Sequence, residues 1–386
     1  MADGAAPRVL MAVEQLRRAV PGGIGMYTRG LLSGLAAVAD DGEDVDITLY
    51  ASRAPRRRPG RRAEAPDPLA GFGRPVILSR WPGPVMTRAW DHGHSGLPNG
   101  FDIVHSVSLA APPPPARGGG RSVITVHDTA WRKYPEATTA RGRKWHEAAL
   151  HRARDSGAAL VVTSGFVAAD LIGDGVDEDR ITVVHGGSDH VVAPDSEQAD
   201  ALLHRLGVEG EFLLTVGTLE PRKNVRRLVA AYDQVRRTLP EPWPLVVVGP
   251  EGWGPTLSRT VHQEGVTFTG AVSDGVLSGL YQRARAFAYV PLTEGYGMPP
   301  LEAMRHGTPS LVAWEVPSVH DLGQTGEPPA LMVDPLSVDA IADGLTTILT
   351  DDAVRADLGG RGRAHALSRT WKLAAQTHVV LWGALT

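Results

Sequence analysis

The sequence predicts an α/β protein with two doubly wound parallel sheets, one in each half of the chain. Short apolar runs of strand length alternate with segments of helical periodicity, and the alternation starts again after residue 191. At 386 residues the chain is long enough for two domains with full cores. We therefore expect one domain over residues 1–190, a second over residues 191–368, and a last helix over residues 369–386.

The first half carries six apolar runs that we expect as buried strands, because each is short and bounded by turn residues. They are residues 8–13, 45–50, 101–105, 123–126, 160–163 and 181–184. Helical patterns cover residues 26–38 and 139–156, and Ser164 is a typical N-cap for a further helix. We expect residues 191–197 to form the linker between the domains.

The second half repeats this pattern of strands and helices. Strands are expected at residues 212–216, 245–248, 266–272, 286–290, 309–312 and 330–333. Helices are expected from Val225 onward and over residues 301–306, 337–350 and 351–368. Such regular alternation is typical of parallel sheets covered by helices on both faces.

Composition and charge exclude several classes of function. Hydrophobic residues make up 42% and charged residues 21% of the chain, and the net charge is −4, so nucleic acid is not expected as the main partner. The absence of cysteine rules out disulfides, cysteine-ligated zinc and a thiol nucleophile. The first residues lack a basic signal-peptide region, and no apolar run approaches membrane-spanning length, so we expect a cytoplasmic protein.

One turn concentrates residues suited to binding a ligand. The sequence Glu294-Gly-Tyr-Gly-Met-Pro-Pro-Leu-Glu302 joins a buried strand to a helix. In an open α/β sheet, ligands bind at the carboxyl ends of the strands. The glycines let the backbone approach a ligand, and the amino end of the helix favours an anion. Because prolines have no N–H, a phosphate here would be held by the amides of Tyr296, Gly297, Met298 or Leu301.

The two glutamates at the ends of this turn narrow the class of ligand. Carboxylates repel phosphate but accept hydrogen bonds from hydroxyl groups, so a phosphate site beside Glu294 and Glu302 indicates a sugar nucleotide. The alternative is a tight turn with both glutamates exposed to solvent. Arg222 and Lys223 support the first interpretation, because cations at the opening of a helix oppose the helix dipole unless an anion lies nearby.

The whole turn, followed by Ala303-Met304 and Gly307-Thr308-Pro309, resembles the signature of the retaining glycosyltransferases of family 4. The resemblance implies the GT-B architecture, in which two Rossmann-like domains face each other across a cleft and the last helix crosses back onto the first domain. It also implies a nucleoside diphosphate sugar as donor, a hydroxyl acceptor and no metal or other cofactor. The second domain would hold the nucleotide, and loops of the first would face the acceptor.

The resemblance also implies roles for particular residues. The catalytic set would be His127, Arg222, Lys223 and Glu294. The set that binds the nucleotide sugar would be Gly22, Gly23, Thr218, Val272, Tyr296, Gly297, Met298 and Glu302.

Within these sets, Gly22 and Gly23 match a glycine pair that lies against the donor diphosphate in the family. His127 matches a histidine near the donor sugar, where orienting hydroxyls is a better role than abstracting a proton. Arg222 and Lys223 match a basic pair that neutralises the diphosphate.

Thr218 departs from the family, which often has arginine there, and this leaves more of the charge to the basic pair. Val272 lies where the family's chain passes the nucleotide base. Glu302 would accept hydrogen bonds from the ribose hydroxyls, and Glu294 from the donor-sugar hydroxyls.

Other patterns in the sequence are weaker evidence for a cofactor, a metal or a membrane contact. The pattern Gly23-x-Gly25-x-x-Thr28 partly matches a dinucleotide-binding fingerprint, but threonine replaces the third glycine and the strand does not directly precede the pattern. The Asp-x-Asp pairs at 44–46 and 177–179 do not follow strands, and His92 with His94 lacks a third zinc ligand. The Arg-rich stretch 53–62 has the composition of a solvated loop, with contact to an anionic lipid surface or acceptor as the alternative.

Two rival functions stay open at this point. A sugar-nucleotide epimerase of the same architecture would share the diphosphate site but need no acceptor. A non-catalytic two-lobed sugar-binding protein would share the shape, but such proteins are normally exported. The turn Glu220-Pro-Arg-Lys-Asn224 resembles enzymes that use mannose nucleotides, so we favour a donor like GDP-mannose.

Overall fold

The computed structural model describes residues 6–18, 21–42, 46–53, 67–115, 119–239, 243–252, 263–320 and 326–386. The chain divides into two compact units. Unit 1 comprises Met1–Thr129, Thr139–Gly187 and Thr370–Thr386, and unit 2 comprises Ala130–Thr138 and Ser188–Arg369. The hypothesis of a lipid or acceptor contact through the Arg-rich stretch falls, from residue 54 onward, outside the described residues.

Unit 1 is built on a parallel sheet that has seven strands among the described residues, in the order β3-β2-β1-β4-β5-β6-β7. The strands are β1 (Arg8–Ala12), β2 (Asp46–Ala51), β3 (Val76–Leu78), β4 (Ile103–Ser106), β5 (Arg121–Val126), β6 (Ala159–Val162) and β7 (Ile181–Val183). The order reverses between β1 and β4, which is the switch point of a doubly wound sheet. The sequence missed the short edge strand β3, which has only three residues.

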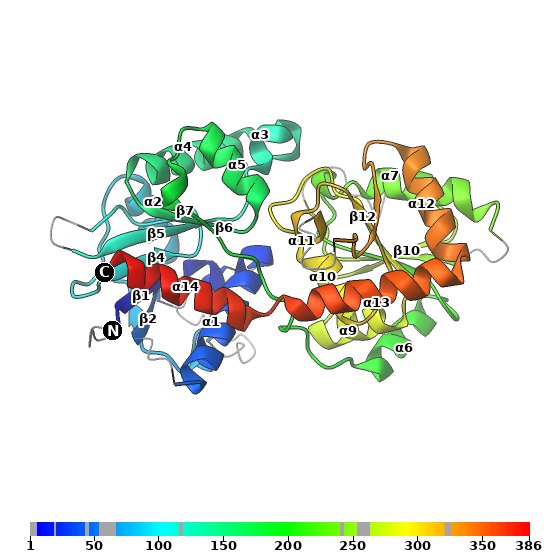
Figure 1. Ribbon diagram of the computed structural model, residues 1–386, viewed down its shortest axis with the longest axis horizontal. Coiled ribbons are helices and arrows are strands. Elements are labelled where there is room, and N and C mark those ends of the chain that lie inside the picture. Colours follow the sequence, from blue (N-terminus) through cyan, green and yellow to red (C-terminus); the bar gives the residue numbers. More distant parts are fainter. Residues whose placement is uncertain are drawn as a thin grey trace, which may run out of the picture. The chain divides into compact units, whose positions relative to one another are not determined.

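The helices of unit 1 lie at the surfaces of this sheet (Figure 1). They are α1 (Gly22–Asp40), α2 (Gly83–Asp91), α4 (Ala140–Asp155), α5 (Gly165–Gly173) and α14 (Trp371–Leu385). The sequence predicts the start of the first helix at residue 26, but α1 begins four residues earlier. Its first turn closes when the Gly25 amide donates to the Pro21 carbonyl at 3.1 Å. Gly22 and Gly23 therefore belong to the helix rather than to a loop before it.

Two further helices of unit 1 begin after a capping side chain, and of these two caps the sequence predicted Ser164. The hydroxyl of Ser164 accepts from the Val167 amide at 3.3 Å at the start of α5, and that of Thr139 accepts from the Gly142 amide at 3.1 Å at the start of α4. The last helix, α14, lies along α1 (Figure 1). The short helix α3 (Ala130–Lys133) groups with unit 2.

Unit 2 has a parallel sheet with six strands among the described residues, in the order β10-β9-β8-β11-β12-β13. The strands are β8 (Leu213–Val216), β9 (Leu245–Val248), β10 (Val266–Gly270), β11 (Ala286–Tyr289), β12 (Ser310–Ala313) and β13 (Leu331–Val333). Its helices are α6 (Ser196–Arg205), α7 (Val225–Arg236), α9 (Asp274–Arg283), α10 (Met298–Arg305), α11 (Pro317–His320), α12 (Val338–Thr350) and α13 (Asp352–Ser368). The predicted fold class, two parallel-sheet Rossmann-like domains, is confirmed.

Three boundaries in unit 2 differ from the prediction. Helix α6 begins inside the predicted linker, because the Asp195 side chain caps it by accepting from the Gln198 amide at 3.0 Å. Helix α10 begins at Met298 rather than Leu301, because its two prolines occupy the first turn. Strand β10 ends at Gly270, so Val272 follows the strand instead of lying in it.

The core of unit 2 shows why its strands are almost uniformly apolar. Alternate residues of a strand face opposite sides of the sheet, and both sides are covered by helices. On β8, Leu213 belongs to one buried layer and Leu214 to the other, and both are fully buried. The neighbouring strands run parallel, with Leu214 opposite Val246 on one side and Phe287 on the other, so the residues after each strand emerge together at one edge.

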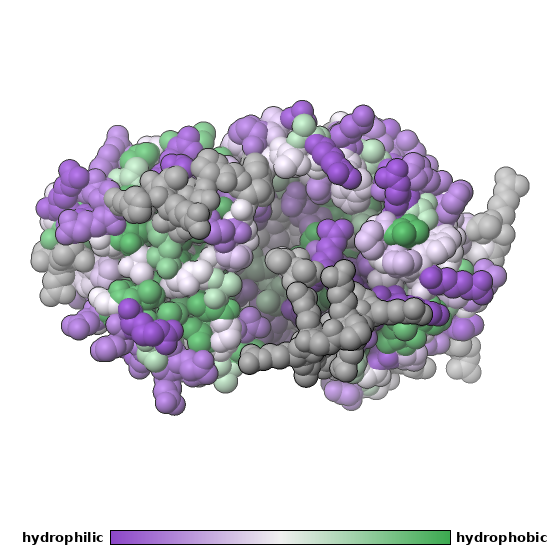
Figure 2. Space-filling view, turned by 180° about the vertical axis from the view of Figure 1, so that it is seen from behind, coloured by the Kyte–Doolittle hydropathy of each residue, from purple (hydrophilic) through white to green (hydrophobic). Residues whose placement is uncertain are grey.

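The surface of the protein is mixed. On the face shown in Figure 2, hydrophilic side chains predominate, with hydrophobic side chains in smaller areas between them. Within the described ranges, no helix is both long enough and apolar enough to cross a membrane.

Candidate active site

The turns after β8 and β11 meet at the carboxyl edge of the unit 2 sheet. The two strands are hydrogen-bonded neighbours in parallel orientation, with Leu214 opposite Phe287. The turns are also bonded directly, because the Leu292 amide donates to the Arg222 carbonyl at 2.9 Å. The basic pair and the first glutamate of the signature, which lie about seventy residues apart in sequence, are thereby brought together.

Three cationic and hydroxyl groups converge on one oxygen of Glu294. Lys223 Nζ lies 2.5 Å from Glu294 Oε1, and Arg222 Nη1 lies 2.8 Å from the same atom. The Tyr289 hydroxyl donates to this oxygen at 2.8 Å and accepts from Lys223 Nζ at 2.7 Å. The side chains of Lys223 and Glu294 are only 13% and 10% exposed, so water screens the pair weakly. We call these four residues the Glu294 cluster.

The electrostatics of the cluster depend on burial and pairing acting in opposite directions. Burial alone would raise the pKa of Glu294, but the charges of Arg222 and Lys223 and the hydrogen bonds to the carboxylate lower it to about 2. Burial lowers the pKa of Lys223, and Glu294 partly offsets this. Burial, followed by the charge of Glu294, raises the pKa of Tyr289 well above its ordinary value. Glu294 is therefore ionised and Tyr289 keeps its proton.

An asparagine fixes the conformation of the turn that carries the basic pair. Asn224 has a φ of 58°, which is rare for a residue other than glycine. Its side-chain amide is buried and donates to the carbonyls of Val290 at 2.9 Å and Pro335 at 2.8 Å. These bonds link the start of α7 to the segment that follows β11 and to the segment that follows β13. Arg222 is held from its other side by Glu220 at 2.8 Å.

Gly297 forms the junction between the Glu294 turn and helix α10. Its φ is 93°, and a Cβ at this position would lie 2.5 Å from Val316 Cγ1, so both conformation and space require glycine. The Ser318 hydroxyl donates to the Gly297 carbonyl at 2.6 Å, and the Ser318 amide donates to the Tyr296 carbonyl at 2.8 Å. Among the first four residues of α10, only Met298 and Leu301 have an amide N–H to offer, because Pro299 and Pro300 have none.

The second glutamate of the signature has partners of its own. Oε1 of Glu302 accepts from His190 Nε2 at 3.0 Å, and Oε2 accepts from the Tyr281 hydroxyl at 2.9 Å. The Glu302 side chain is 13% exposed. Burial and the neighbouring Glu302 raise the pKa of Tyr281 well above its ordinary value. The carboxylate thus has a fixed orientation in which each oxygen carries one protein hydrogen bond and keeps capacity for another.

The remaining predicted residues of unit 2 lie near this edge with fewer contacts. Thr218 follows β8, and its carbonyl accepts from the Glu220 amide at 2.8 Å. Val272 is partly buried against the core layer that contains Val248. No contact of either side chain defines a ligand, so their roles stay predictions.

In unit 1, His127 follows β5 at the carboxyl edge of its own sheet. Its Nε2 lies 2.7 Å from the Val107 carbonyl, and its own carbonyl accepts from the Thr163 hydroxyl at 3.0 Å. Burial lowers the pKa of His127, opposed by the bond to Val107 and the charge of Asp128, so the ring is neutral near pH 7. Gly22 and Gly23 begin α1 in the same unit, and a Cβ at either would meet no atom within 4 Å.

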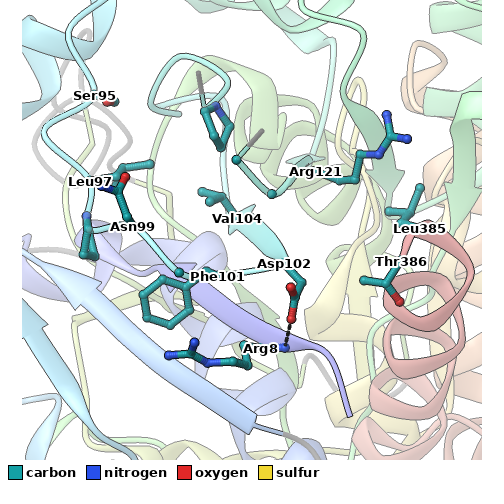
Figure 3. Close-up of a pocket in the computed structure, with 15 residues that line it drawn as sticks. Arg8, Ser95, Leu97, Asn99, Phe101, Asp102, Val104, Arg121, Leu385 and Thr386 are labelled. Atoms are coloured by element: carbon teal, nitrogen blue, oxygen red, sulfur yellow. Dashed lines mark hydrogen bonds between the residues drawn. The ribbon is translucent and has the colours of Figure 1, made fainter. Parts of the chain in front are cut away.

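A cavity of about 670 Å³ in unit 1 lies at the opposite edge of the sheet, at the amino ends of β1, β4 and β5 (Figure 3). Arg8, Asp102 and Arg121 line it, and the Arg8 amide donates to the Asp102 carboxylate at 2.8 Å. Ligands of doubly wound sheets bind at the carboxyl ends, so we do not assign the donor to this cavity. Among the described residues, no group of three or more His, Cys, Asp or Glu side chains could hold a metal ion.

Two family profiles match the chain in order, "Glycosyltransferase Family 4" over residues 21–191 and "Glycosyl transferases group 1" over residues 204–365. The O-antigen chain mannosyltransferase B of Escherichia coli is 32% identical over an alignment of 262 residues, gaps included, that covers 65% of this chain and 67% of that protein. The chain belongs to glycosyltransferase family 4. The serotype-specific mannosyltransferase WbdA of Escherichia coli is 31% identical to this glycosyltransferase over an alignment of 201 residues, gaps included, that covers 48% of this chain but only 22% of WbdA.

A solved structure supports the fold of this glycosyltransferase. The crystal structure of Anabaena Alr3699/HepE in complex with UDP and glucose matches with a TM-score of 0.70, covering 98% of this chain and 100% of that one, at 17% identity. An identity this low supports the GT-B fold and not the ligand.

Sequence reasoning missed three residues that the structure places in contact with the predicted carboxylates. Tyr289 touches Glu294, and Tyr281 and His190 touch Glu302. A tyrosine that ends an otherwise apolar strand, as Tyr289 does, places a hydroxyl at the carboxyl edge, and this signal could have identified it. No local signal marks His190, because it lies in the irregular stretch of unit 2 that precedes α6.

Proposed function

We propose that this glycosyltransferase moves a hexose from a nucleoside diphosphate sugar to a hydroxyl acceptor, with retention at the anomeric carbon and without a metal ion. We further propose a donor of the GDP-mannose type. Mannosyltransferases among the relatives support this choice, together with the turn from Glu220 to Asn224. The arrangement of the Glu294 cluster is the observation that carries the proposal.

The cluster has the chemistry needed to stabilise a departing diphosphate. Two cations, Arg222 and Lys223, are aimed at a single anionic oxygen in a weakly hydrated site. Cations held in place before reaction stabilise developing negative charge without having to reorganise. The amides of Gly297 and Met298, at the amino end of α10, would add further donors to the diphosphate. We propose that both cations contact the diphosphate oxygens, and that Glu294 then accepts hydrogen bonds from the hydroxyls of the donor sugar.

The proposed reaction uses the leaving group as the base. The bond between the anomeric carbon and the diphosphate oxygen breaks, and a bond to the acceptor oxygen forms on the same face of the sugar. The acceptor's proton passes to the leaving phosphate oxygen, so charges and atoms balance without an enzyme carboxylate as nucleophile. The double ion pairing of Glu294 supports this scheme, because a carboxylate held by two cations is a poor nucleophile.

Glu302 would bind the ribose of the nucleotide. Its two oxygens are already oriented by His190 and Tyr281, and each retains a lone pair for a hydroxyl. A carboxylate fixed in this way would select a ligand with two adjacent hydroxyl groups, such as a ribose.

A panel of nucleoside diphosphates in a thermal-shift assay tests the nucleotide site, since a ligand that binds only the folded state raises Tm. We expect GDP to give the largest increase and nucleosides without phosphate to give little. If no nucleoside diphosphate raises Tm, the proposed nucleotide site is wrong.

Incubating GDP-mannose alone, and then with a hydroxyl acceptor, separates the rival functions. An epimerase alters the donor alone, a binding protein alters nothing, and a transferase releases GDP and a glycoside only when the acceptor is present.

A further inference from the structure

His127 is held by a hydrogen bond of its ring nitrogen and by an aromatic neighbour, and the sequence predicted neither contact. A carbonyl oxygen can only accept, so Nε2 of His127 carries the hydrogen in its 2.7 Å contact with Val107. In the neutral ring, Nδ1 is then the acceptor. One hydrogen bond fixes the tautomer but leaves the ring free to turn about the axis of that bond.

The ring of Tyr27 removes this freedom. Its centroid lies 4.9 Å from that of His127, with the planes at 83°, an edge-to-face arrangement. Tyr27 belongs to α1 and is buried. The imidazole plane is therefore set by the position of a tyrosine that has no part in the predicted donor site.

Tyr27 is itself held by the first residue of the last helix. Its ring makes a second edge-to-face contact with Trp371, at 5.3 Å and 84°. Trp371 is 1% exposed and begins α14, directly after the N-cap Thr370. Three aromatic rings, from α14, α1 and the end of β5, thus form a continuous stack of perpendicular pairs.

Two glycines of α1 leave the space in which Trp371 packs. A Cβ on Gly30 would lie 2.0 Å from Trp371 Cε2, and a Cβ on Gly34 would lie 2.1 Å from the Trp371 carbonyl. Gly30 and Gly34 follow Tyr27 by three and seven residues, so all three lie on one face of the helix. This face leaves space for one bulky side chain in a single position, which fixes Trp371 and, through it, Tyr27.

We propose that Tyr27 and Trp371 are positioning residues for His127, and that they hold its Nδ1 ready to accept a hydrogen bond from a sugar hydroxyl. This inference rests on the proposed function for the role of the sugar, but the positioning itself is a property of unit 1. The last helix then contributes to activity through its first residue as well as to the stability of the unit.

The first experiment follows the imidazole directly and needs no substrate. The ¹⁵N shifts of a histidine report which nitrogen is protonated and its titration midpoint, and the His127→Gln variant assigns the signal among the 14 histidines. In the unaltered protein we expect a proton on Nε2 and a midpoint below that of a free histidine. In Tyr27→Leu and Trp371→Leu we expect a mixture of tautomers and a midpoint shifted upward. Unchanged shifts in both variants would overturn the proposal.

Matched variants separate positioning from loss of packing. Tyr27→Phe and Trp371→Phe keep a ring at each position, and we expect His127 signals close to those of the unaltered protein. Tyr50→Leu removes a buried tyrosine elsewhere in unit 1, one that packs against Trp90, and should destabilise the fold without altering the His127 signals. A change in Tyr50→Leu as large as that in Tyr27→Leu would mean general loosening and would contradict the proposal.

A double-mutant cycle tests the consequence for transfer. We expect Tyr27→Leu to lower kcat about tenfold, within the range that a small misplacement of a catalytic group produces. If Tyr27 acts through His127, Tyr27→Leu should not lower kcat further in a His127→Ala background. If its effect is purely structural, the two substitutions should lower kcat additively, in terms of free energy. If His127→Ala leaves kcat unaltered, the predicted role of His127 in orienting sugar hydroxyls is wrong, and the ¹⁵N experiment still decides whether Tyr27 and Trp371 position its ring.

Discussion

Lys223 Nζ lies 2.5 Å from Glu294 Oε1, and this contact joins the turn after β8 to the turn after β11. The pair is more than a local ion pair, because Arg222 and Tyr289 contact the same carboxylate oxygen. An incoming diphosphate would replace a protein anion as the partner of both cations. The cations therefore need no rearrangement, and the carboxylate they release becomes available to the sugar.

Replacing the lysine tests whether it stabilises the leaving group. Lys223→Ala should lower kcat by about a hundredfold or more, the usual effect of removing one preorganised charge contact. The control is Arg237→Ala in the same unit, whose side chain is 72% exposed in an ion pair with Asp233 and should leave kcat unaltered. Thermal melts of both variants check folding. A folded Lys223→Ala with the kcat of the parent would exclude Lys223 from the site.

Replacing the glutamate separates binding from catalysis. Glu294→Gln removes the negative charge that competes with the diphosphate, so affinity for GDP should not fall. Transfer should be lost, because the amide cannot match the carboxylate as an acceptor for the sugar hydroxyls. Isothermal titration with GDP and a transfer assay provide the two measurements. A variant that loses GDP binding while keeping transfer would reverse these assignments.

The same substitution has a pH-dependent effect on stability. The pKa of Glu294 falls from 4.5 to about 2 in the folded state, so the unfolded state binds the proton more tightly. The stabilisation is present above pH 4.5 and is lost as the pH falls toward 2. It amounts to about 3 kcal/mol at 1.36 kcal/mol per pKa unit. Urea unfolding at pH 6 and pH 3 should show a smaller acid-induced loss in Glu294→Gln than in the parent, and equal losses would contradict the ion pairing.

These residues show how far the sequence alone could go. The strand pattern predicted both sheets, because a parallel strand buried on two faces is apolar throughout and is easily recognised. The spacing of Glu294 from the strand end placed it at the carboxyl edge. The pattern could not show that Lys223 and Glu294 touch, since their contact depends on β8 and β11 being neighbours in the sheet. The contacts of His190 and Trp371 could not be predicted for the same reason, because their partners lie far away in sequence.

Gly297 provides a test of the junction with α10. Gly297→Ala adds a Cβ that would lie 2.5 Å from Val316 Cγ1 at a φ of 93°, so both strain and a clash follow. We expect a loss of stability of about 2–3 kcal/mol and weaker GDP binding, because the turn and the first amides of α10 must move. Gly270→Ala is the matched control, with a φ of 73° and nothing within 4 Å of its Cβ. The control should lower the free energy of unfolding by only about 1 kcal/mol and leave GDP binding unaltered.

His378 makes the packing of α14 sensitive to acid. Its pKa is lowered from 6.5 to about 4 by burial, although Nδ1 is bonded to the Ala374 carbonyl. The unfolded state therefore binds a proton more readily, and stability is complete above pH 6.5 and is lost as the pH falls toward 4. The loss should reach about 3 kcal/mol. His378→Leu should abolish most of it in urea unfolding at pH 7 and pH 4.5, while His92→Leu, at an exposed position, should not.

Metal removal tests the electrostatic scheme as a whole. If Arg222, Lys223 and the amides of α10 neutralise the diphosphate, no divalent ion is needed for that purpose. Activity should then survive dialysis against EDTA, and adding Mg²⁺ or Mn²⁺ afterwards should not increase it. The Lys223→Ala variant sharpens the test, because an ion that took over the role of the lysine would restore activity in the variant but not change the parent. Loss of parental activity on chelation, with recovery on metal addition, would mean that a bound ion and not the basic pair carries the charge of the leaving group.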